Sequence, residues 1–361
     1  MATVVTRYLN TASTAGGDGT TNATAGANRA YHTLSAALAA IATEFANFVT
    51  SDVQVDLLCE GGADTATVTT PAITTDATRF LRVKANTGQE ALPTGWSTSR
   101  YRLSCNTTPL NMGTNIKFMR VEGLQIECTN NTANSNQRGI ILAPGAGSST
   151  QIISECRIRW SGTGATSGHA GIFILSGSGS NNTKIGIVNC IVEDWSFTGS
   201  AGINCQIGTG GADNIVFCYH TLTYNCTVGF QKNAGFQSGP MTKNSVAAAC
   251  ATGWVASTGF APGTDFNASD QATVPGSNSI ASQTFAFTNA GAGDYTLTDS
   301  DPMVAAGTSL ISDSIWPVTL DIAGASRTVP ISIGPVEHDI AGGGGSAVPV
   351  IVHHLRQQGI C

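Results

Sequence analysis

Two glutamates in the middle of the chain have the residue type and the spacing that acid–base chemistry needs. Glu127 and Glu155 occupy the same place in two similar segments. If these segments form neighbouring parallel strands, both carboxylates point outward from the same face, about 5 Å apart. That separation suits retaining glycoside hydrolysis. Arg157 and Arg159 follow directly, however, so a surface ladder of ion pairs explains the same pattern, and both interpretations stay open.

Other chemically suggestive residues give weaker patterns. Glu193 and Asp194 are adjacent, so on one strand they face opposite sides and do not act together. Asp299 and Asp301 suit either a cation or a polar turn. None of the ten cysteines forms a CxxC pair, so no zinc or redox site is predicted. We expect no metal and no cofactor.

The cysteines mark an internal repeat instead. Cysteine ends each of four similar segments, and a glycine followed by apolar residues comes after each of them. Both columns recur about every 30 residues, a period typical of solenoids and related arrays. The cysteine segments are Leu124–Cys128, Ile152–Cys156, Gly186–Cys190 and Asn214–Cys218, with Ser245–Cys250 a looser fifth; the glycines are Gly139, Gly171, Gly202, Gly229 and Gly253.

Each repeat holds short apolar runs separated by Gly, Ser, Asn and Thr, with no helical period. This pattern predicts an all-β, right-handed parallel β-helix in which each repeat is one coil and each column is one stacked file. We expect the cysteines to be small buried residues of the interior. With Cys128 and Cys156 inside, alternation places Ile126 and Ile152 inside as well.

One clear helix precedes the repeats, from Tyr31 to Phe48. Its apolar residues recur at steps of three and four, and Thr33 is a suitable N-cap. We interpret it as a lid on the first coil. The predicted parts are an irregular N-terminal arm with this helix (1–49), the β-helix (50–280), a closing β segment (281–340), and a Gly-rich linker with an apolar tail (341–361).

The stretch from Tyr31 to Leu38 resembles the opening helix of the pectate-lyase-like superfamily, and the residues from Asp294 to Glu337 resemble its closing segment. This resemblance implies the right-handed β-helix fold but no activity. The superfamily's calcium-binding Asp clusters and its polygalacturonase motifs are absent. The segment Gly168-His169-Ala170-Gly171 is only a fragment of the latter.

Composition and charge exclude further classes of function. The chain has 17 basic and 23 acidic residues among 361, with no basic stripe, so nucleic-acid binding is not expected. No apolar run is long enough to cross a membrane. The N-terminus lacks the pattern of a secretion signal, which indicates folding in a reducing cytoplasm.

The C-terminal tail is the predicted partner-binding segment. A short apolar peptide on a glycine tether either folds back on its own coils or docks on a neighbouring subunit, for instance by strand addition. The histidine pair in it is more typical of a contact than of a metal site. The predicted contact residues are Val348, Pro349, Val350, Ile351, Val352, His353, His354 and Leu355.

These features favour a non-enzymatic structural protein of a bacteriophage virion, made in the host cytoplasm. It would be a capsid decoration, a head fibre or a tail spike. Its Gly-, Thr- and Ala-rich composition and its tethered apolar terminal peptide resemble those of phage structural proteins. The resemblance to viral β-helices implies a homotrimer. Other virion proteins and a host surface glycan are further expected partners. The alternatives are a tailspike polysaccharide depolymerase that uses Glu127 and Glu155, and a cell-surface adhesin.

Overall fold

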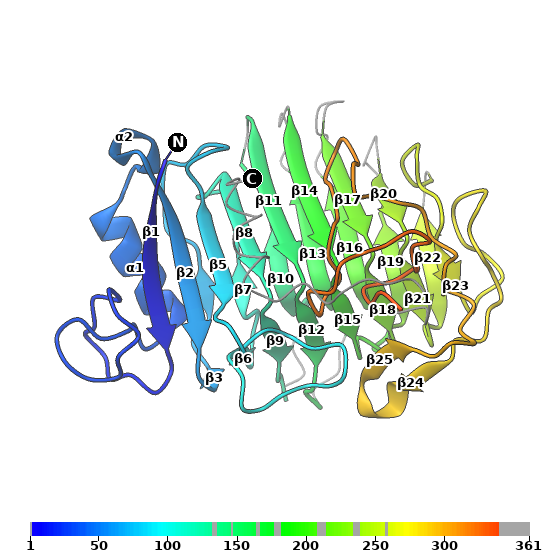
Figure 1. Ribbon diagram of the computed structural model, residues 1–361, viewed down its shortest axis with the longest axis horizontal. Coiled ribbons are helices and arrows are strands. Elements are labelled where there is room, and N and C mark those ends of the chain that lie inside the picture. Colours follow the sequence, from blue (N-terminus) through cyan, green and yellow to red (C-terminus); the bar gives the residue numbers. More distant parts are fainter. Residues whose placement is uncertain are drawn as a thin grey trace.

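The computed structural model describes residues 2–131, 136–145, 147–163, 167–176, 182–207, 214–233, 239–256 and 259–338. Three parallel sheets of eight, eight and seven strands run along its length, and the chain passes from one sheet to the next in every coil (Figure 1). Parallel strands stacked in this way form a parallel β-helix. The predicted fold class, an all-β right-handed parallel β-helix, is therefore confirmed.

Within each coil, the chain visits sheet 1, sheet 2 and sheet 3 in that order. Sheet 1 contains β1 (Thr3–Asn10), β2 (Val53–Glu60), β5 (Leu81–Ala85), β8 (Phe118–Glu122), β11 (Ser149–Ser154), β14 (Thr183–Val188), β17 (Ile215–Tyr219) and β20 (Pro240–Lys243). Sheet 2 contains β3 (Ala63–Asp64), β6 (Arg102–Cys105), β9 (Gln125–Cys128), β12 (Arg157–Trp160), β15 (Ile191–Glu193), β18 (Leu222–Tyr224), β21 (Val246–Ala248) and β23 (Ala268–Ser269). Sheet 3 contains β4 (Val68–Thr69), β7 (Leu110–Asn111), β10 (Arg138–Leu142), β13 (Ala170–Ser176), β16 (Ala201–Ile207), β19 (Val228–Lys232) and β22 (Thr252–Ala256).

The predicted glycine column is a true file in sheet 3. The strand registers place Gly139, Gly171, Gly202, Gly229 and Gly253 in line, one in each successive coil. A Cβ atom on Gly139 would lie 2.5 Å from the carbonyl oxygen of Gly171, and one on Gly229 would lie 2.6 Å from that of Gly253. Glycine recurs here because the backbones of successive coils leave no room for a side chain.

The predicted cysteine column, in contrast, is not a single file. Cys156 and Cys190 lie in register at the corner between sheets 1 and 2, but Cys128 lies in β9 of sheet 2 and Cys218 in β17 of sheet 1. The four sequence segments look alike because in each of them the cysteine follows an apolar run, whether it lies in a strand or at a corner. Their different positions become visible only in the strand register.

The residues in line with Cys156 and Cys190 at this corner, which we call the corner file, bind backbone carbonyls. Cys190 donates to the carbonyl oxygens of Val188 and Ile153, at 3.3 and 3.6 Å. In the next coil, the hydroxyl of Thr221 donates to the equivalent carbonyls of Tyr219 and Ile187, at 3.2 and 3.4 Å. All nine cysteines in the described part of the chain are buried and free, as expected. At this corner, however, cysteine acts as a small hydrogen-bond donor and not only as an apolar filler.

The predicted N-terminal capping helix is confirmed, but it is shorter than the predicted span from Tyr31 to Phe48. The lid helix α1 (Leu34–Glu44) begins at Thr33, whose hydroxyl accepts a bond from the Ala36 amide, and its buried face covers the first coils. The short helix α2 (Phe48–Ser51) follows it. The expectation that residues 1–30 are irregular is wrong for β1, which pairs with β2 along its whole length. The stack therefore begins near residue 3 and not at residue 50.

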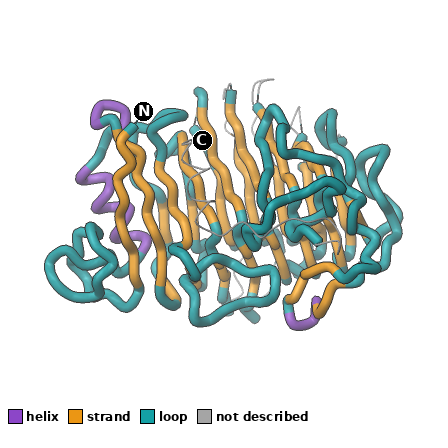
Figure 2. Tube along the Cα trace, viewed as in Figure 1, coloured by secondary structure: helices purple, strands orange, loops and turns teal. Residues whose placement is uncertain are grey.

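The chain after β23 folds back along the outside of the stack. Apart from the hairpin of β24 (Phe287–Asn289) and β25 (Asp294–Leu297), joined by the 3₁₀ turn η1 (Ala290–Ala292), this closing segment consists of loops (Figure 2). Leu310 and Val318 pack on Ile152 of sheet 1, whereas Ile153 faces the interior. The prediction that Ile152 points inward is therefore wrong; its outer position is covered by the closing segment.

Candidate functional site

The outer face of sheet 2 carries the charged residues that the sequence pointed to. The register places Ser104, Glu127, Arg159 and Glu193 in one outward ladder across four successive coils. A second outward file beside it contains Arg157. Opposite charges alternate along the first ladder, an arrangement that stabilises neighbouring strands through side-chain pairing.

Glu127 is fully engaged in this ladder. Arg159 Nε donates to Glu127 Oε1 at 2.8 Å, and Ser104 donates to Oε2 at 2.8 Å. The ring of Trp96 stacks on the Arg159 guanidinium at 3.9 Å. Burial alone would raise the pKa of Glu127, but the Ser104 bond and the charge of Arg159 hold it below its usual value. Glu127 is therefore a carboxylate near neutral pH, and both of its oxygens are occupied.

Glu193 is held even more tightly. Arg157 donates from Nε and Nη2 to its two carboxylate oxygens, at 2.6 and 2.8 Å, and the Tyr295 hydroxyl donates to the second oxygen at 2.7 Å. Arg157 also donates to the Leu92 carbonyl at 3.1 Å. Burial and the adjacent Glu193 carboxylate raise the pKa of Tyr295. This buried group links two adjacent coils to each other, and it also links them to the loop before β6 and to the C-terminal hairpin.

The proposed pairing of Glu127 with Glu155 is wrong. The register sets Arg159, and not Glu155, opposite Glu127. Glu155 stands at the corner between sheets 1 and 2, with a left-handed backbone of φ 57°. Because each corner residue leaves its strand ladder, Glu155 does not share the outward face of Glu127. The two carboxylates therefore do not form the pair that retaining hydrolysis needs.

Glu155 nevertheless has unusual electrostatics. Burial, together with the nearby carboxylates of Glu122, Asp321 and Glu90, raises its pKa to about 8. The side chain is therefore largely protonated at neutral pH. Asp194, the other acidic candidate, sits at the next corner, where the Asn225 amide donates to it at 2.8 Å, and burial raises its pKa.

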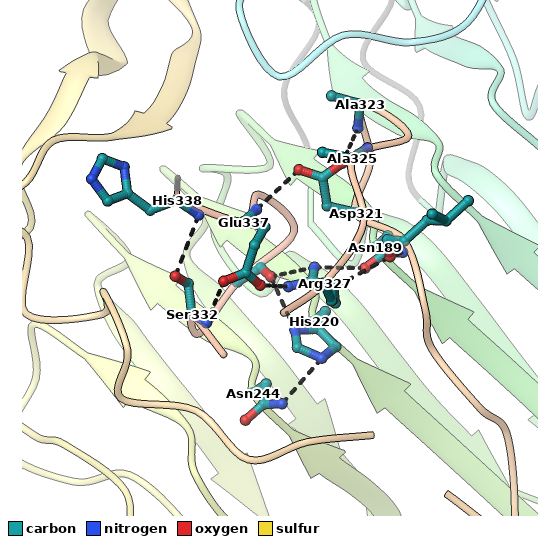
Figure 3. A network of polar contacts seen from close by, with 12 residues as sticks. Asn189, His220, Asn244, Asp321, Ala323, Ala325, Arg327, Ser332, Glu337 and His338 are labelled. Atoms are coloured by element: carbon teal, nitrogen blue, oxygen red, sulfur yellow. Dashed lines mark hydrogen bonds and ion pairs between the residues drawn. The ribbon is translucent and has the colours of Figure 1, made fainter. Parts of the chain in front are cut away.

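A second polar cluster lies where the closing segment meets the corner between sheets 1 and 2 (Figure 3). Arg327 is buried and donates to Glu337 Oε2 at 3.0 Å, to Asn189 Oδ1 at 2.9 Å and to the Gly334 carbonyl at 2.9 Å. The Asn189 amide donates to the Leu320 carbonyl at 2.7 Å. We call this cluster, with His220, Asn244 and Asp321, the corner clasp.

His220 is the centre of the clasp on the β-helix side. The Asn244 amide lies 3.1 Å from Nε2, and the Gly334 carbonyl lies 3.2 Å from Nδ1. An amide donates and a carbonyl accepts, so these partners assign the proton to Nδ1 and leave Nε2 as acceptor. Burial and the nearby Arg327 charge hold the pKa of His220 well below its usual value. The imidazole is therefore neutral, as this bonding pattern requires.

Asp321 and Glu337 complete the clasp from the closing segment. Asp321 accepts the backbone amides of Ala323, Ala325 and Glu337, at 2.9, 2.8 and 3.0 Å, and Glu337 accepts the Ser332 amide at 3.0 Å. These bonds fold the loops around Arg327. The arrangement fixes the closing segment to the stack.

The remaining candidates also have structural partners. The imidazole of His169 accepts the Gln137 amide at 3.0 Å and packs against Trp160. Asp301 accepts two backbone amides, whereas Asp299 pairs with His338 at 2.9 Å. Within the described residues, no three His, Cys, Asp or Glu side chains form a group that could hold a metal ion.

The predicted partner-binding residues 348–355 lie outside the described residues. No described helix is both long and apolar enough to cross a membrane. The clasp residues Arg327, His220 and Asn189 were missed by sequence reasoning. A left-handed corner favours Asn, and Asn189 and Asn244 directly follow their strands with left-handed backbones. Only these two residues of the cluster therefore had a recognisable pattern in the sequence.

No protein-family model matches the chain, and no curated protein matches it either. Among solved structures, it is similar to the crystal structure of pectate lyase Pel9A, with 12% sequence identity and a TM-score of 0.32. The alignment covers 94% of this chain and 97% of that one.

Proposed function

We propose that the protein is a non-enzymatic structural component of a bacteriophage virion, either a capsid decoration or head fibre or part of a tail spike. The observation that carries this proposal is the state of the outward carboxylates. Glu127 and Glu193 are each bound by an arginine of the neighbouring coil. They stabilise the stack, whereas a glycan-cleaving enzyme needs an acid and a base that reach the substrate.

The closing segment supports the same role. It covers the outer faces of sheets 1 and 2 with apolar side chains and is fixed by the corner clasp. Packing and fastening of this kind suit a structural component, because they bury the closing segment against the stack. The partners we propose are further copies in a homotrimer, other virion proteins bound through residues 348–355, and a host surface glycan.

Purified virus particles provide the test. We expect the protein in washed particles, and we expect a chain without residues 347–361 to fold normally but to be missing from them. Circular dichroism of the purified truncated chain is the control for folding. Normal incorporation of the truncated chain would refute the tail anchor. Finding the protein only on virus-free cells would refute the virion role and favour an adhesin.

The second candidate is a polysaccharide depolymerase, and it is favoured by Glu155. A carboxyl group whose pKa is about 8 keeps the proton that a general acid must give to a leaving group. Incubation with host capsule would show this activity as released reducing ends or unsaturated sugars. Activity that disappears in Glu155→Gln but survives in the matched surface variant Glu44→Gln would establish the enzyme and overturn the structural proposal.

A further inference from the structure

The first strand of the stack has an edge that is only half covered. β1 is the end strand of sheet 1, and β2 is the one strand of that sheet with which it pairs. The amides of Thr3 and Thr11 donate toward the β2 side, to Asp52 and Glu60 at 2.9 and 3.2 Å. In a parallel ladder, successive residues turn their backbone groups to opposite edges. The even-numbered residues of β1 therefore present theirs to the outer edge.

The segment around residues 19–31 covers only the second half of that edge. The Tyr8 amide donates to the Gly19 carbonyl at 2.8 Å, and the Asn10 amide donates to that of Tyr31 at 2.9 Å. Across the described residues, the amides of Val4 and Thr6 have no such cover, and the Thr6 carbonyl accepts only the side chain of Arg7 at 3.1 Å. The uncovered half of the edge thus runs from Val4 to Thr6.

An exposed apolar side chain lies on this edge strand itself. Val4 is 45% exposed, and it is one of only six large apolar side chains exposed in the described part of the chain. An open edge with an exposed valine is a template for another strand, and folded proteins usually protect such edges.

The chain itself contains a segment of the matching kind. Residues 348–355 read Val-Pro-Val-Ile-Val-His-His-Leu, rich in β-branched residues and without charge apart from the histidines. The proline is compatible with a strand that becomes the new edge, where one side of its backbone stays unpaired. Strand addition to an exposed edge is a general mode of peptide recognition.

The linker before residue 348 is short compared with the distance from the closing segment to the Val4–Thr6 edge of the same chain. Gly334, near the end of the closing segment, lies beside Asn244 at the end of β20, because its amide donates to the Asn244 carbonyl at 2.8 Å. Seven strand spacings separate β20 from β1, which is about 34 Å at 4.8 Å each. A flexible linker of about ten residues has an average span of about 18 Å. A chain that paired with its own edge would therefore need a linker extended well beyond its average span.

From these observations we propose that residues 348–355 of one copy add as a strand to the Val4–Thr6 edge of a second copy. The contact joins unlike surfaces, the tail of one chain and the first strand of the next. Repetition of such a contact gives a ring if it closes, and an open chain if it does not. A closed ring of three would produce the homotrimer. The inference concerns the purified protein and does not depend on the virion role.

Sedimentation of the full-length protein tests this proposal. We expect assemblies of two or more chains, and single chains both when residues 347–361 are deleted and in Thr6→Pro, which removes the outer-edge amide. Thr6→Val retains that amide and is the matched control, so it should assemble like the wild type. Circular dichroism confirms that each variant is folded.

Mixing the two defective proteins gives the sharpest result. The truncated chain retains the edge and Thr6→Pro retains the tail, so together they should form a 1:1 complex and nothing larger. Assembly of Thr6→Pro like the wild type, a wild type that stays monomeric, or a mixture without any complex would each overturn the proposal. A truncated chain that is absent from particles while Thr6→Pro assembles normally would refute this receptor edge but leave the tail anchor intact.

Discussion

Arg157 and Glu193 form a two-point ion pair between adjacent coils, with Nε–Oε1 and Nη2–Oε2 distances of 2.6 and 2.8 Å. Both side chains are almost fully buried, at 1% and 5% exposure. The pair exists because β12 and β15 set the two residues on the same outer face and the C-terminal hairpin then covers them. The charged residues here look like a surface ladder in the sequence, but Arg157 and Glu193 form a buried ion pair, an internal joint between two coils.

Breaking this joint should weaken the fold strongly. Glu193→Gln leaves the Arg157 charge buried without its counter-ion, and such changes typically cost about 3–5 kcal/mol. Urea unfolding followed by circular dichroism measures the loss. The control is Asp52→Asn, which removes an exposed partner of Arg79 and should cost less than about 1 kcal/mol. Equal effects of the two substitutions would contradict the assignment of a buried joint.

Glu155 should make the protein less stable as the pH rises. Its pKa is about 8 in the folded chain and 4.5 in the reference state, so between these values the folded state binds more protons than the unfolded state. Its contribution is therefore fully present below about pH 4.5 and lost as the pH rises through 8. Glu155→Gln cannot titrate. In unfolding experiments, the stability of the variant relative to the wild type should increase from pH 5 to pH 9; a constant difference would refute the shifted pKa.

His220 should act in the opposite direction. Its folded pKa lies well below the reference value of 6.5, so the unfolded state takes up the proton first as the pH falls. The contribution of the clasp is thus complete above about pH 6.5 and lost progressively below it. His220→Gln can donate to Gly334 and accept from Asn244 without titrating, so its stability should fall less between pH 7 and pH 5. An unchanged pH profile would contradict a neutral, clasped imidazole.

The sequence predicted the parts of the fold that depend on local repetition. The glycine file, the lid helix with its Thr33 cap, and the burial of the cysteines all follow from spacing and residue type. The strand β1 was missed because Thr3–Asn10 lies before the repeat and obtains its partner only from β2. The Glu127–Glu155 pair failed because one residue leaves the ladder at a corner, and a single position of register decides which residues face each other.

The corner file predicts a graded response at Cys190. Thr221 and Ser245 occupy the equivalent place in the next two coils and make equivalent bonds to backbone carbonyls. Cys190→Ser should therefore be nearly neutral, Cys190→Val should lose about 1 kcal/mol with the donor, and Cys190→Asp should damage folding because its carboxylate is buried without a partner. Thermal unfolding of the three variants gives the order. Cys190→Val more stable than Cys190→Ser would show that the thiol serves only as an apolar filler.

The glycine file gives the most direct test of coil stacking. A Cβ at Gly171 would meet the side chain of Val192 and lie 2.7 Å from the Gly202 carbonyl oxygen, so the coils must move apart to admit it. Gly171→Ala should therefore destabilise the fold by roughly 1–3 kcal/mol, as overpacked cores do. Gly62→Ala is the matched control, because the nearest atom to its added Cβ is 3.9 Å away. Unfolding in urea measures both. If Gly171→Ala proved as stable as Gly62→Ala, successive coils could not lie as close together as this file requires.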